Sequence, residues 1–536
     1  MSDDYLWWRD GVIYQIYPRS FADTDGDGIG DLPGLISRLD YLNGAPDSLG
    51  VDAIWLSPIY PSPMYDFGYD VADYENIDLA FGRLEDFDRL TAECHKRGIR
   101  VVMDLVLNHS SHQHPWFIES RSSRDNPKRD WYIWRDPKRG GGAPNNWQAR
   151  FGGSGWEWDE RTDQYYYHMF LKEQPDLNWR NPELRARIFQ AVKFWLDRGV
   201  DGFRLDVVNA YFKDERFRNN PPAPGRRAYD RQKHIYDLNR PELIDVYQEL
   251  RRRLDSYSER MAVGEVMDAT PELVGRFCGP DRLHLAFDFE LTDQPWRARA
   301  FHEALSRNES ALRSDTQPCY ALSNHDRDRH ATRYGGGPES DARAKAAALL
   351  LLTTRSTPFI YYGEEIGMQN TPIPRAEVQD PYGKRYPRLG RDPERAPMQW
   401  SAEANAGFTT GRPWLRLNKD YRKRNVAAQQ PDPDSVLSFY KQVIRFRRES
   451  VALRRGKYEP VIRRPVNVLA YVRRAPEQIM LVALNFTGRK TSAAIDETLL
   501  AKNWRLRLTS VPGEGERLKE GKVTLAPFEA CVLEAE

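Results

Sequence analysis

The chain has few cysteines and almost no net charge, and both absences narrow what it can be. Its four cysteines are scattered without close pairs, at Cys94, Cys278, Cys319 and Cys531, a spacing that fits neither a disulfide framework nor a zinc site. Reduced thiols in a cytoplasmic protein are therefore expected. The 79 Lys and Arg residues against 78 Asp and Glu residues leave a formal net charge of +1, too little to attract nucleic acid or an acidic membrane surface.

The sequence also lacks the features of a secretion signal or a membrane span. It begins MSDDYLWWRDG, which is acidic and aromatic and has no basic region followed by an apolar one. No apolar run is long enough to cross a bilayer, so we expect no membrane partner. Aromatic residues, in contrast, are abundant: they make up 12% of the chain, with 15 Trp and 27 Tyr. Their flat apolar faces are useful for ligand contact.

Short apolar runs alternate with amphipathic stretches through the first four-fifths of the chain. Such runs occur at residues 12–17, 53–56, 101–107, 202–206 and 359–362, and helical patterning is clear at residues 183–197 and 341–354. This alternation predicts a parallel β/α architecture. The chain of 536 residues is longer than one core usually fills, so we expect smaller domains attached to a large one.

Two segments break the alternation. Residues 110–175 are rich in Gly, Pro, Asn and Trp and predict an inserted subdomain, whereas residues 458–536 carry short alternating stretches typical of an antiparallel β-sandwich domain. The main domain then comprises residues 1–109 and 176–457. The six tryptophans of the insert are expected mainly to pack it, with one or two at a cleft as the alternative; they are Trp116, Trp131, Trp134, Trp147, Trp156 and Trp158.

Carboxylates follow three apolar runs, at the position where a parallel barrel places its reactive groups. Arg204 and Asp206 end GFRLD two residues apart, so both leave the same face of a strand; Glu265 ends MAVGE and Asp326 ends LSNHD. Taken singly, an Arg–Asp pair can be structural, and a glutamate such as Glu265 can begin a helix. Three in succession favour double displacement at an anomeric carbon, in which one carboxylate attacks and another protonates the leaving oxygen.

The chain resembles the α-amylase family of glycoside hydrolases, and within it the α-glucosidase and oligo-1,6-glucosidase branch. The matching segments run in order along nearly the whole chain: WWRDGVIYQIYPRSFADTDGDGIGDLPG (7–34), DLVLNH (104–109), QPDLNW (174–179), GFRLD (202–206), GE (264–265), NHD (324–326), GEEIGM (363–368) and RAPMQW (395–400). The resemblance implies a (β/α)₈ TIM barrel with an inserted subdomain after strand 3 and a C-terminal antiparallel β-domain. It also implies a retaining α-glucosidase that releases, and can transfer, terminal glucose from short oligosaccharides of the maltose and isomaltose type.

The resemblance further implies catalytic roles for individual residues. Asp206 would be the nucleophile and Glu265 the general acid/base. Asp326 would bind the 2- and 3-hydroxyls of the sugar, and Arg204 would keep Asp206 ionised. The pKa of Glu265 should then lie well above that of Asp206, because Glu265 has to hold a proton when substrate binds.

Five further residues would bind the sugar, according to the same resemblance. His109 and His325 would hydrogen-bond the bound glucose, and Tyr69 would stack under its ring. Asp66 together with Arg395 would recognise the non-reducing end at O4 and O6. Such a charged wall would stop a longer chain from passing the site and would make the enzyme exo-acting.

An acidic loop near the N-terminus predicts a metal site. The run DTDGDG at residues 23–28 fits the opening of a calcium loop. It is not an EF-hand, because loop position 12 is Gly34 and not a glutamate. The resemblance implies one structural divalent cation, Ca²⁺ or Mg²⁺, with a solvated acidic turn as the alternative and no organic cofactor. Its ligands would be Asp23, Asp25, Asp27, the Ile29 carbonyl and Asp31.

Substrate preference leaves alternatives open. In the resembled branch, a valine at the position of Val207 goes with tolerance for α-1,6 linkages. Residues 211–240 depart from oligo-1,6-glucosidases and should overhang the acceptor side of the site. Relatives with the same three carboxylates include sucrose hydrolases, sucrose isomerases and trehalose synthases. Other proteins of this fold are non-catalytic partners of transporters and lack the catalytic carboxylates. We expect small oligosaccharides as ligands and a monomer or homodimer.

Overall fold

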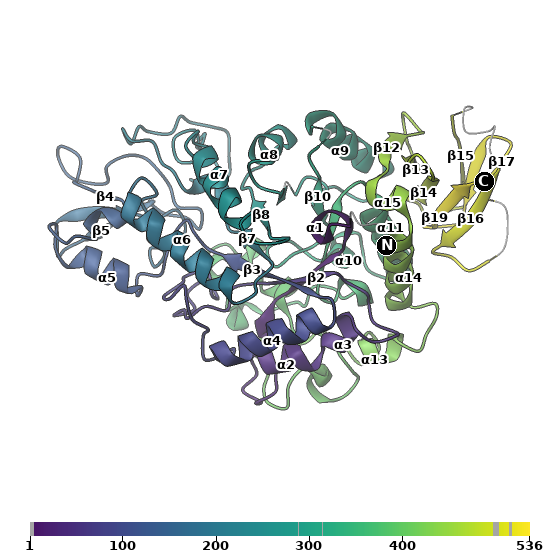
Figure 1. Cartoon of the computed structure of the whole chain (residues 1–536), viewed down its shortest axis with the longest axis horizontal. Helices are drawn as coiled ribbons and strands as arrows, with labels where there is room; N and C mark the ends of the chain where they lie inside the picture. Colours follow the sequence, from purple (N-terminus) through teal and green to yellow (C-terminus); the bar gives the residue numbers. More distant parts are fainter. Residues whose placement is uncertain (1–4, 288, 314, 497–502, 514–516) are drawn as a thin grey trace.

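A computed structural model describes residues 5–287, 289–313, 315–496, 503–513 and 517–536 (Figure 1). The first four residues of the N-terminal sequence considered above lie outside this part. Eight parallel strands form one sheet in the order β10-β11-β1-β2-β3-β7-β8-β9. Their bounds are β1 Ile13–Ile16, β2 Ala53–Leu56, β3 Arg100–Leu105, β7 Gly202–Leu205, β8 Met261–Glu265, β9 Leu285–Phe287, β10 Cys319–Ala321 and β11 Thr357–Tyr361.

The sheet closes on itself, because β9 at one edge also contacts β10 at the other. The five apolar runs predicted as strands coincide with or overlap β1, β2, β3, β7 and β11. The predicted fold class is therefore confirmed: the chain forms a (β/α)₈ barrel with a C-terminal antiparallel domain. The larger helices of the barrel domain are α4 Leu84–Lys96, α6 Pro182–Asp197, α7 Leu243–Leu254, α9 Ala298–Ala311, α11 Ser340–Thr353 and α14 Val436–Glu449.

Shorter helices complete the domain. They are α1 Trp7–Asp10, α2 Leu32–Ser37, α3 Leu39–Leu42, α8 Pro271–Phe277, α10 His330–Arg333, α12 Pro381–Arg385, α13 Val426–Gln429 and α15 Val451–Arg455. Within the described residues, no helix combines the length and the apolar character that a membrane crossing requires.

Helix α6 shows how local sequence sets an element's limits. The side chain of Asn181 accepts hydrogen bonds from the backbone N–H groups of Glu183 and Leu184, and Pro182 occupies the first turn, where its missing N–H is no loss. The helix ends just before Gly199, whose φ of +92° favours glycine. Between these signals, buried residues recur at helical spacing along one face.

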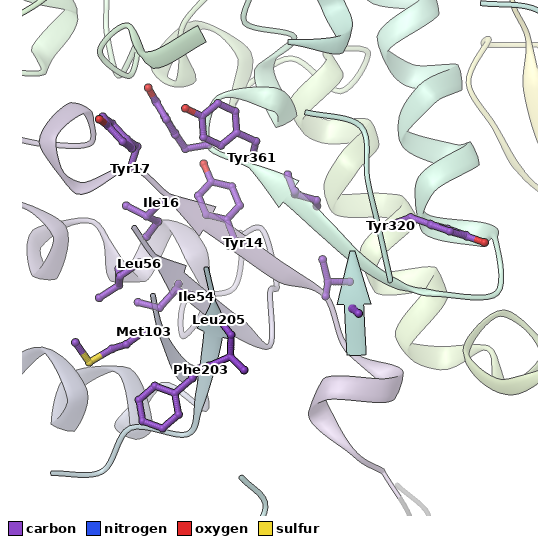
Figure 2. Packing of buried hydrophobic residues seen from close by; sticks show 14 of the residues in the cluster. Tyr14, Ile16, Tyr17, Ile54, Leu56, Met103, Phe203, Leu205, Tyr320 and Tyr361 are labelled. Atoms are coloured by element: carbon purple, nitrogen blue, oxygen red, sulfur yellow. The ribbon is translucent and has the colours of Figure 1, made fainter. Parts of the chain in front are cut away.

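Alternation along the strands separates two apolar layers. Ile13 and its neighbours on the other strands fill the inside of the barrel together with the buried ring of Trp7. Tyr14 and Ile16 point the opposite way, as do Leu56 and Leu205, and pack outward beneath the helices (Figure 2). Because both faces of the strands are covered, their sequences read as continuous apolar runs.

The segment predicted as an insert contains helix α5 and a small antiparallel sheet in the order β4-β6-β5. Their bounds are α5 Pro115–Ser122, β4 Trp134–Arg135, β5 Trp156–Asp159 and β6 Gln164–Tyr167. Figure 1 shows these elements together at one end of the molecule and the C-terminal sheets at the other.

The C-terminal region forms two antiparallel sheets with a shared core. Their orders are β12-β13-β14-β19-β16 and β15-β18-β17, and Val472 and Leu481 of one sheet share a cluster with Val523 and Leu525 of the other. The exact limits predicted for the four domain segments stay predictions. The strands are β12 Lys457–Pro460, β13 Val468–Arg474, β14 Ile479–Asn485, β15 Thr491–Ala494, β16 Trp504–Thr509, β17 Leu518–Lys519, β18 Lys522–Leu525 and β19 Ala530–Ala535.

Candidate active site

The predicted site residues converge at the carboxyl ends of the barrel strands. Asp206 directly follows β7, Glu265 ends β8, and His109 follows β3. Asp326 is not at a strand end as predicted, because β10 stops at Ala321 and a loop continues to it. A cleft of about 860 Å³ opens at this face. Six of the predicted residues line it, namely Asp66, Tyr69, His109, Asp206, Glu265 and Asp326.

A single buried guanidinium connects the carboxylates of three neighbouring strands. Arg204 Nη1 lies 2.9 Å from Asp206 Oδ1 and 2.7 Å from Asp104 Oδ1. Arg204 Nη2 donates to Glu265 Oε2. The register of the parallel strands pairs Asp104 with Arg204 and Leu205 with Gly264, which sets these groups side by side. One positive charge therefore serves three carboxyl groups.

This sharing changes the expected ionisation of Asp206. Burial raises its pKa, the Arg204 guanidinium lowers it, and Glu265, which hydrogen-bonds to it, raises it again, so that its pKa lies well above the usual value. The prediction that Arg204 keeps Asp206 acidic overlooked burial and the second carboxyl. Such a pair titrates as a unit. A single proton shared by the pair leaves one member neutral and the other charged.

The opposite side of the cleft holds a carboxylate surrounded by cationic groups. Asp326 Oδ1 accepts hydrogen bonds from Arg395 Nη2 at 2.9 Å and from Arg391 Nη1 at 3.2 Å. Burial acts to raise the pKa of Asp326, but the guanidinium groups of Arg391 and Arg395 outweigh it and hold that pKa below its usual range. Asp326 is therefore a permanent anion, unlike Asp206.

Aromatic contacts fix the imidazole of His325. Its ring stacks on Tyr69 with centroids 5.5 Å apart and planes at 1°, and its Nε2 lies 2.7 Å from the Tyr69 hydroxyl oxygen. The Gln15 side-chain amide nitrogen lies 2.8 Å from Nδ1. Burial lowers the pKa of His325 to about 3, so the ring is neutral at physiological pH. Burial likewise lowers the pKa of His109 to about 4.

Asp66 does not bond to Arg395, the residue with which it was expected to recognise the non-reducing end of the sugar. Asp66 Oδ1 instead accepts from Arg391 Nη2 at 2.7 Å, and Arg391 also donates to Asp380. Arg395 lies four residues further on, buried beneath the site, where it donates to the His325 carbonyl at 2.8 Å and to Asp326. The two arginines flank the same 3₁₀ turn, Asp392–Arg395, and only Arg391 faces the cleft. The motif match began at Arg395 and so favoured the inner arginine.

Three supporting residues were missed by sequence reasoning. Asp104 accepts from Arg204 and from the Tyr69 hydroxyl, and burial raises its pKa to about 6 although Arg204 opposes this. The Gln174 amide bridges Asp66 and His109. Both open segments that matched the family, DLVLNH and QPDLNW, so the motifs themselves carried the signal. Asp380 had no such signal.

The outer cleft is formed by loops from three regions. Residues 211–240 border the cleft, since Arg226, Arg227 and Asp230 line it; their place on the acceptor side stays a prediction. Helix α12 and the residues after it contribute tyrosine and arginine side chains. The insert contributes Phe151 and Phe170, whereas no tryptophan is among the described residues that line the cleft. Five of the six tryptophans of the insert are buried and pack it, whereas Trp158 is exposed.

Val207, next to Asp206, also lines the cleft. Its φ of +36° is unusual for a β-branched residue. The following 3₁₀ turn, Val208–Ala210, begins at this point and carries the chain away from the strand. The strained backbone turns the valine side chain beside the carboxylates.

The acidic loop brings three of its five predicted ligands together. The carboxylates of Asp23, Asp25 and Asp27 lie within 4.8 Å of one another. The Asp31 carboxylate instead accepts hydrogen bonds from the backbone N–H groups of Thr24 and Gly34 and caps helix α2. Gly28 is required here, because a Cβ on it would lie 1.9 Å from the Arg412 carbonyl oxygen. Burial and the neighbouring carboxylates raise the pKa of Asp27.

The chain is similar in sequence to known proteins along most of its length. Residues 15–456 match the family model described as "Alpha amylase, catalytic domain". A protein of Rhizobium meliloti (strain 1021) named "Probable alpha-glucosidase" is 46% identical over 483 residues, covering 86% of each chain. The oligo-1,6-glucosidase of Parageobacillus thermoglucosidasius is 39% identical over 562 residues, covering 98% of each.

A solved structure is also similar to this chain over nearly its whole length. The trehalulose synthase MutB from Pseudomonas mesoacidophila MX-45 matches with a TM-score of 0.90 and 37% identity, covering 99% of this chain and 100% of that one. A variant of MutB has been crystallised with sucrose, described as its substrate.

Proposed function

The chain belongs to the α-amylase family, and from this premise we propose that it is an exo-acting retaining α-glucosidase. It would remove terminal α-linked glucose from short oligosaccharides of the maltose and isomaltose type. The observation that carries the proposal is that Asp206 and Glu265 both accept hydrogen bonds from the single Arg204 guanidinium. Two carboxyl groups held by one guanidinium suit a retaining mechanism, which needs them closer together than an inverting mechanism does.

The chemistry follows from one proton on this pair. With the proton on Glu265, the Asp206 carboxylate attacks the anomeric carbon as Glu265 protonates the departing glycosidic oxygen. The bond to the leaving sugar breaks and a glucosyl ester with Asp206 forms. Glu265, now a carboxylate, takes a proton from water, whose oxygen attacks the same carbon and releases Asp206. A sugar hydroxyl in place of water gives transfer, which we include in the proposal.

Exo action is supported by the charged groups at the inner end of the cleft. Asp66, Arg391 and Asp380 form a hydrogen-bonded set there, with Gln174 holding the second oxygen of Asp66 at 3.2 Å. Such groups suit the hydroxyls of a terminal sugar. Asp326, held as an anion, would bind the 2- and 3-hydroxyls, while His109, His325 and Tyr69 complete the pocket.

The direct test uses the purified protein with maltose, isomaltose and maltotetraose. The proposal requires glucose from all three and, from maltotetraose, maltotriose as the other first product. No glucose from maltose or isomaltose would contradict the proposed activity. Release of maltose units without glucose would contradict exo action.

Val207 is proposed to set linkage tolerance. We expect Val207→Thr, which preserves side-chain volume but replaces a methyl group by a hydroxyl, to lower the isomaltose-to-maltose ratio of kcat/KM by about 10-fold. Its position beside Asp206 on the cleft wall is the physical reason. Steady-state kinetics on both disaccharides measure this ratio, and an unchanged ratio would show that Val207 is not the determinant.

A sucrose-active or isomerising enzyme is the second candidate, favoured by the full-length similarity to trehalulose synthase. Such an enzyme would use the same three carboxylates and differ in its loops. Incubation with sucrose, with the sugar products separated by chromatography, distinguishes the two. Rapid conversion of sucrose to an isomeric disaccharide, with slow release of glucose from maltose, would favour the second candidate.

We also propose a structural divalent cation, Ca²⁺ or Mg²⁺, held by Asp23, Asp25 and Asp27. The donor set fits, because three carboxylates converge, none of them forms an ion pair with a basic side chain of the described residues, and hard cations prefer oxygen ligands. The cation would neutralise their repulsion and hold the loop. Both carboxylate oxygens of Asp31 already accept hydrogen bonds from backbone N–H groups, so we do not include Asp31 among the proposed ligands.

Metal removal should lower thermal stability. A cation present at about 100-fold above its Kd stabilises the folded state by about 2.7 kcal/mol, so EDTA should lower Tm and added Ca²⁺ should restore it. Differential scanning calorimetry measures this, and the Asp25→Asn/Asp27→Asn variant should lose the response. A Tm that is unaffected by EDTA and by Ca²⁺ would support the solvated acidic turn.

For location and assembly, we propose a cytoplasmic protein that acts as a monomer or homodimer on small sugars. The four cysteines, all within the described residues, are buried and form no disulfide, which supports a reducing compartment.

A further inference from the structure

Two strongly basic segments stand out in a chain of formal net charge +1. Residues 226–233, RRAYDRQK, contain four basic residues and one acidic residue, and residues 382–390, YGKRYPRLG, contain three basic residues and no acidic one. Below, these two segments together are called the basic rim. Its charge is local, because the basic rim carries +6 and the rest of the chain carries a net charge of −5.

The two halves of the basic rim meet at the mouth of the cleft. The guanidinium of Arg227 donates to the Tyr382 hydroxyl, and the Tyr382 ring stacks on Phe151 with centroids 4.7 Å apart. Arg226, Arg227, Tyr382 and Arg388 all line the cleft. The rim therefore borders the space that a leaving sugar or an acceptor would occupy, outside the carboxylates.

The acidic groups of the outer cleft are already engaged. Asp230 accepts from Arg227 Nε at 2.9 Å, Asp268 lies 3.8 Å from Arg150, and Asp328 accepts from the Asn370 amide at 2.6 Å. Arg226 and Arg388 are exposed, and neither has a carboxylate partner in the described part of the chain. Arg226 and Arg388 of the rim thus present cationic groups that form no ion pair with the described residues.

We propose that the basic rim binds an oxyanion, a phosphate or a carboxylate, carried by the leaving or accepting group. Anionic α-glucosides would then be preferred over neutral ones. The planar fork of arginine matches both oxyanions and gives charge-assisted hydrogen bonds. Cations around a cleft also raise the local concentration of anionic ligands. This inference rests on the proposed α-glucosidase function and adds the chemical class of its aglycone.

The test compares three substrates that differ only at the second sugar: maltose, maltose carrying a phosphate on O6 of its reducing-end glucose, and maltobionate, which carries a carboxylate. At low ionic strength, kcat/KM for at least one anion should exceed that for maltose by about 10-fold. At about 1 M salt, where charges are screened within about 3 Å, the advantage should disappear. A preference for the phosphate alone or the carboxylate alone identifies the group.

Two double variants test whether the basic rim causes the preference for anionic substrates. Arg226→Gln/Arg388→Gln should bring the anionic-to-neutral ratio of kcat/KM close to one. Arg463→Gln/Arg464→Gln removes two exposed charges between β12 and β13, outside the cleft lining, and should leave the ratio as it is. A wild-type ratio of one or less, or a ratio retained in the first variant, would overturn the proposal.

A binding measurement tests the basic rim independently of the proposed glucosidase activity. Calorimetric titration of an Asp206→Asn protein with the same three ligands requires no turnover and should show tighter binding of the preferred anion. If the wild-type protein does not cleave maltose but this difference in binding is found, the proposed glucosidase function fails and the basic rim stands. Equal binding of all three ligands overturns the rim proposal by itself.

Discussion

Asp206→Asn is expected to lower kcat on maltose by about 10⁴-fold or more, the scale seen when a covalent nucleophile is removed. The amide keeps the size of the side chain but cannot form a glucosyl ester. It also keeps a hydrogen-bond acceptor for Arg204, so the fold should persist. Steady-state kinetics measure the loss.

A mechanism-based fluoroglucoside adds a second readout. Mass spectrometry should find the trapped sugar on the peptide that contains Asp206 in the wild-type protein and no trapped sugar in the variant. Asp268→Asn is the matched control: it removes another carboxylate of the cleft, at a φ of +51° that asparagine adopts readily, and should retain turnover. Turnover or trapping in Asp206→Asn comparable to wild type would refute the assignment.

Arg204→Met is expected to cause the largest loss of stability, on the order of 3–5 kcal/mol. The side chain of Arg204 is only 1% exposed, and its removal leaves Asp104, Asp206 and Glu265 buried without their cation. The measurement is thermal or denaturant unfolding, with Arg204→Lys as a control that keeps the charge but loses the fork.

The loss should depend on pH. Burial already raises the pKa values of Asp104, to about 6, and of Asp206, and removal of the guanidinium raises them further. A carboxyl whose folded pKa is raised destabilises the fold increasingly as the pH rises from its unfolded to its folded pKa, and fully above the latter, because the unfolded chain ionises it first. The difference from wild type should therefore be small near pH 5 and grow as the pH rises to 8. An equal loss at both pH values would mean that packing, not charge, is responsible.

Much of the fold could be predicted because buried parallel strands have continuous apolar sequences. Residues 53–56 and β2 coincide, and helix α6 begins within one residue of its predicted start. The strand β9, Leu285–Phe287, had no such signal, because three residues are too few for a periodic pattern. The position of Asp326 in a loop was missed because LSNHD looks like the end of a strand.

The residues of the site could be predicted from the sequence, but several of the contacts between them could not. The motifs carry Asp206, Glu265 and Asp326, but the sharing of Arg204 with Asp104 depends on the register between β3 and β7. Similarly, whether Arg391 or Arg395 faces the cleft depends on the direction in which each side chain leaves the 3₁₀ turn Asp392–Arg395. The raised pKa of Asp206 follows from burial, which no local sequence pattern reveals.

The stereochemistry of the first product tests the central claim most directly. Proton NMR, recorded before mutarotation as p-nitrophenyl α-glucoside is hydrolysed, reports the anomer of the one glucose released. Maltose is unsuitable because its reducing-end glucose already contains both anomers. Two displacements at one carbon, by Asp206 and then by water activated by Glu265, predict α-glucose first. Initial release of β-glucose would mean a single displacement and would contradict the account.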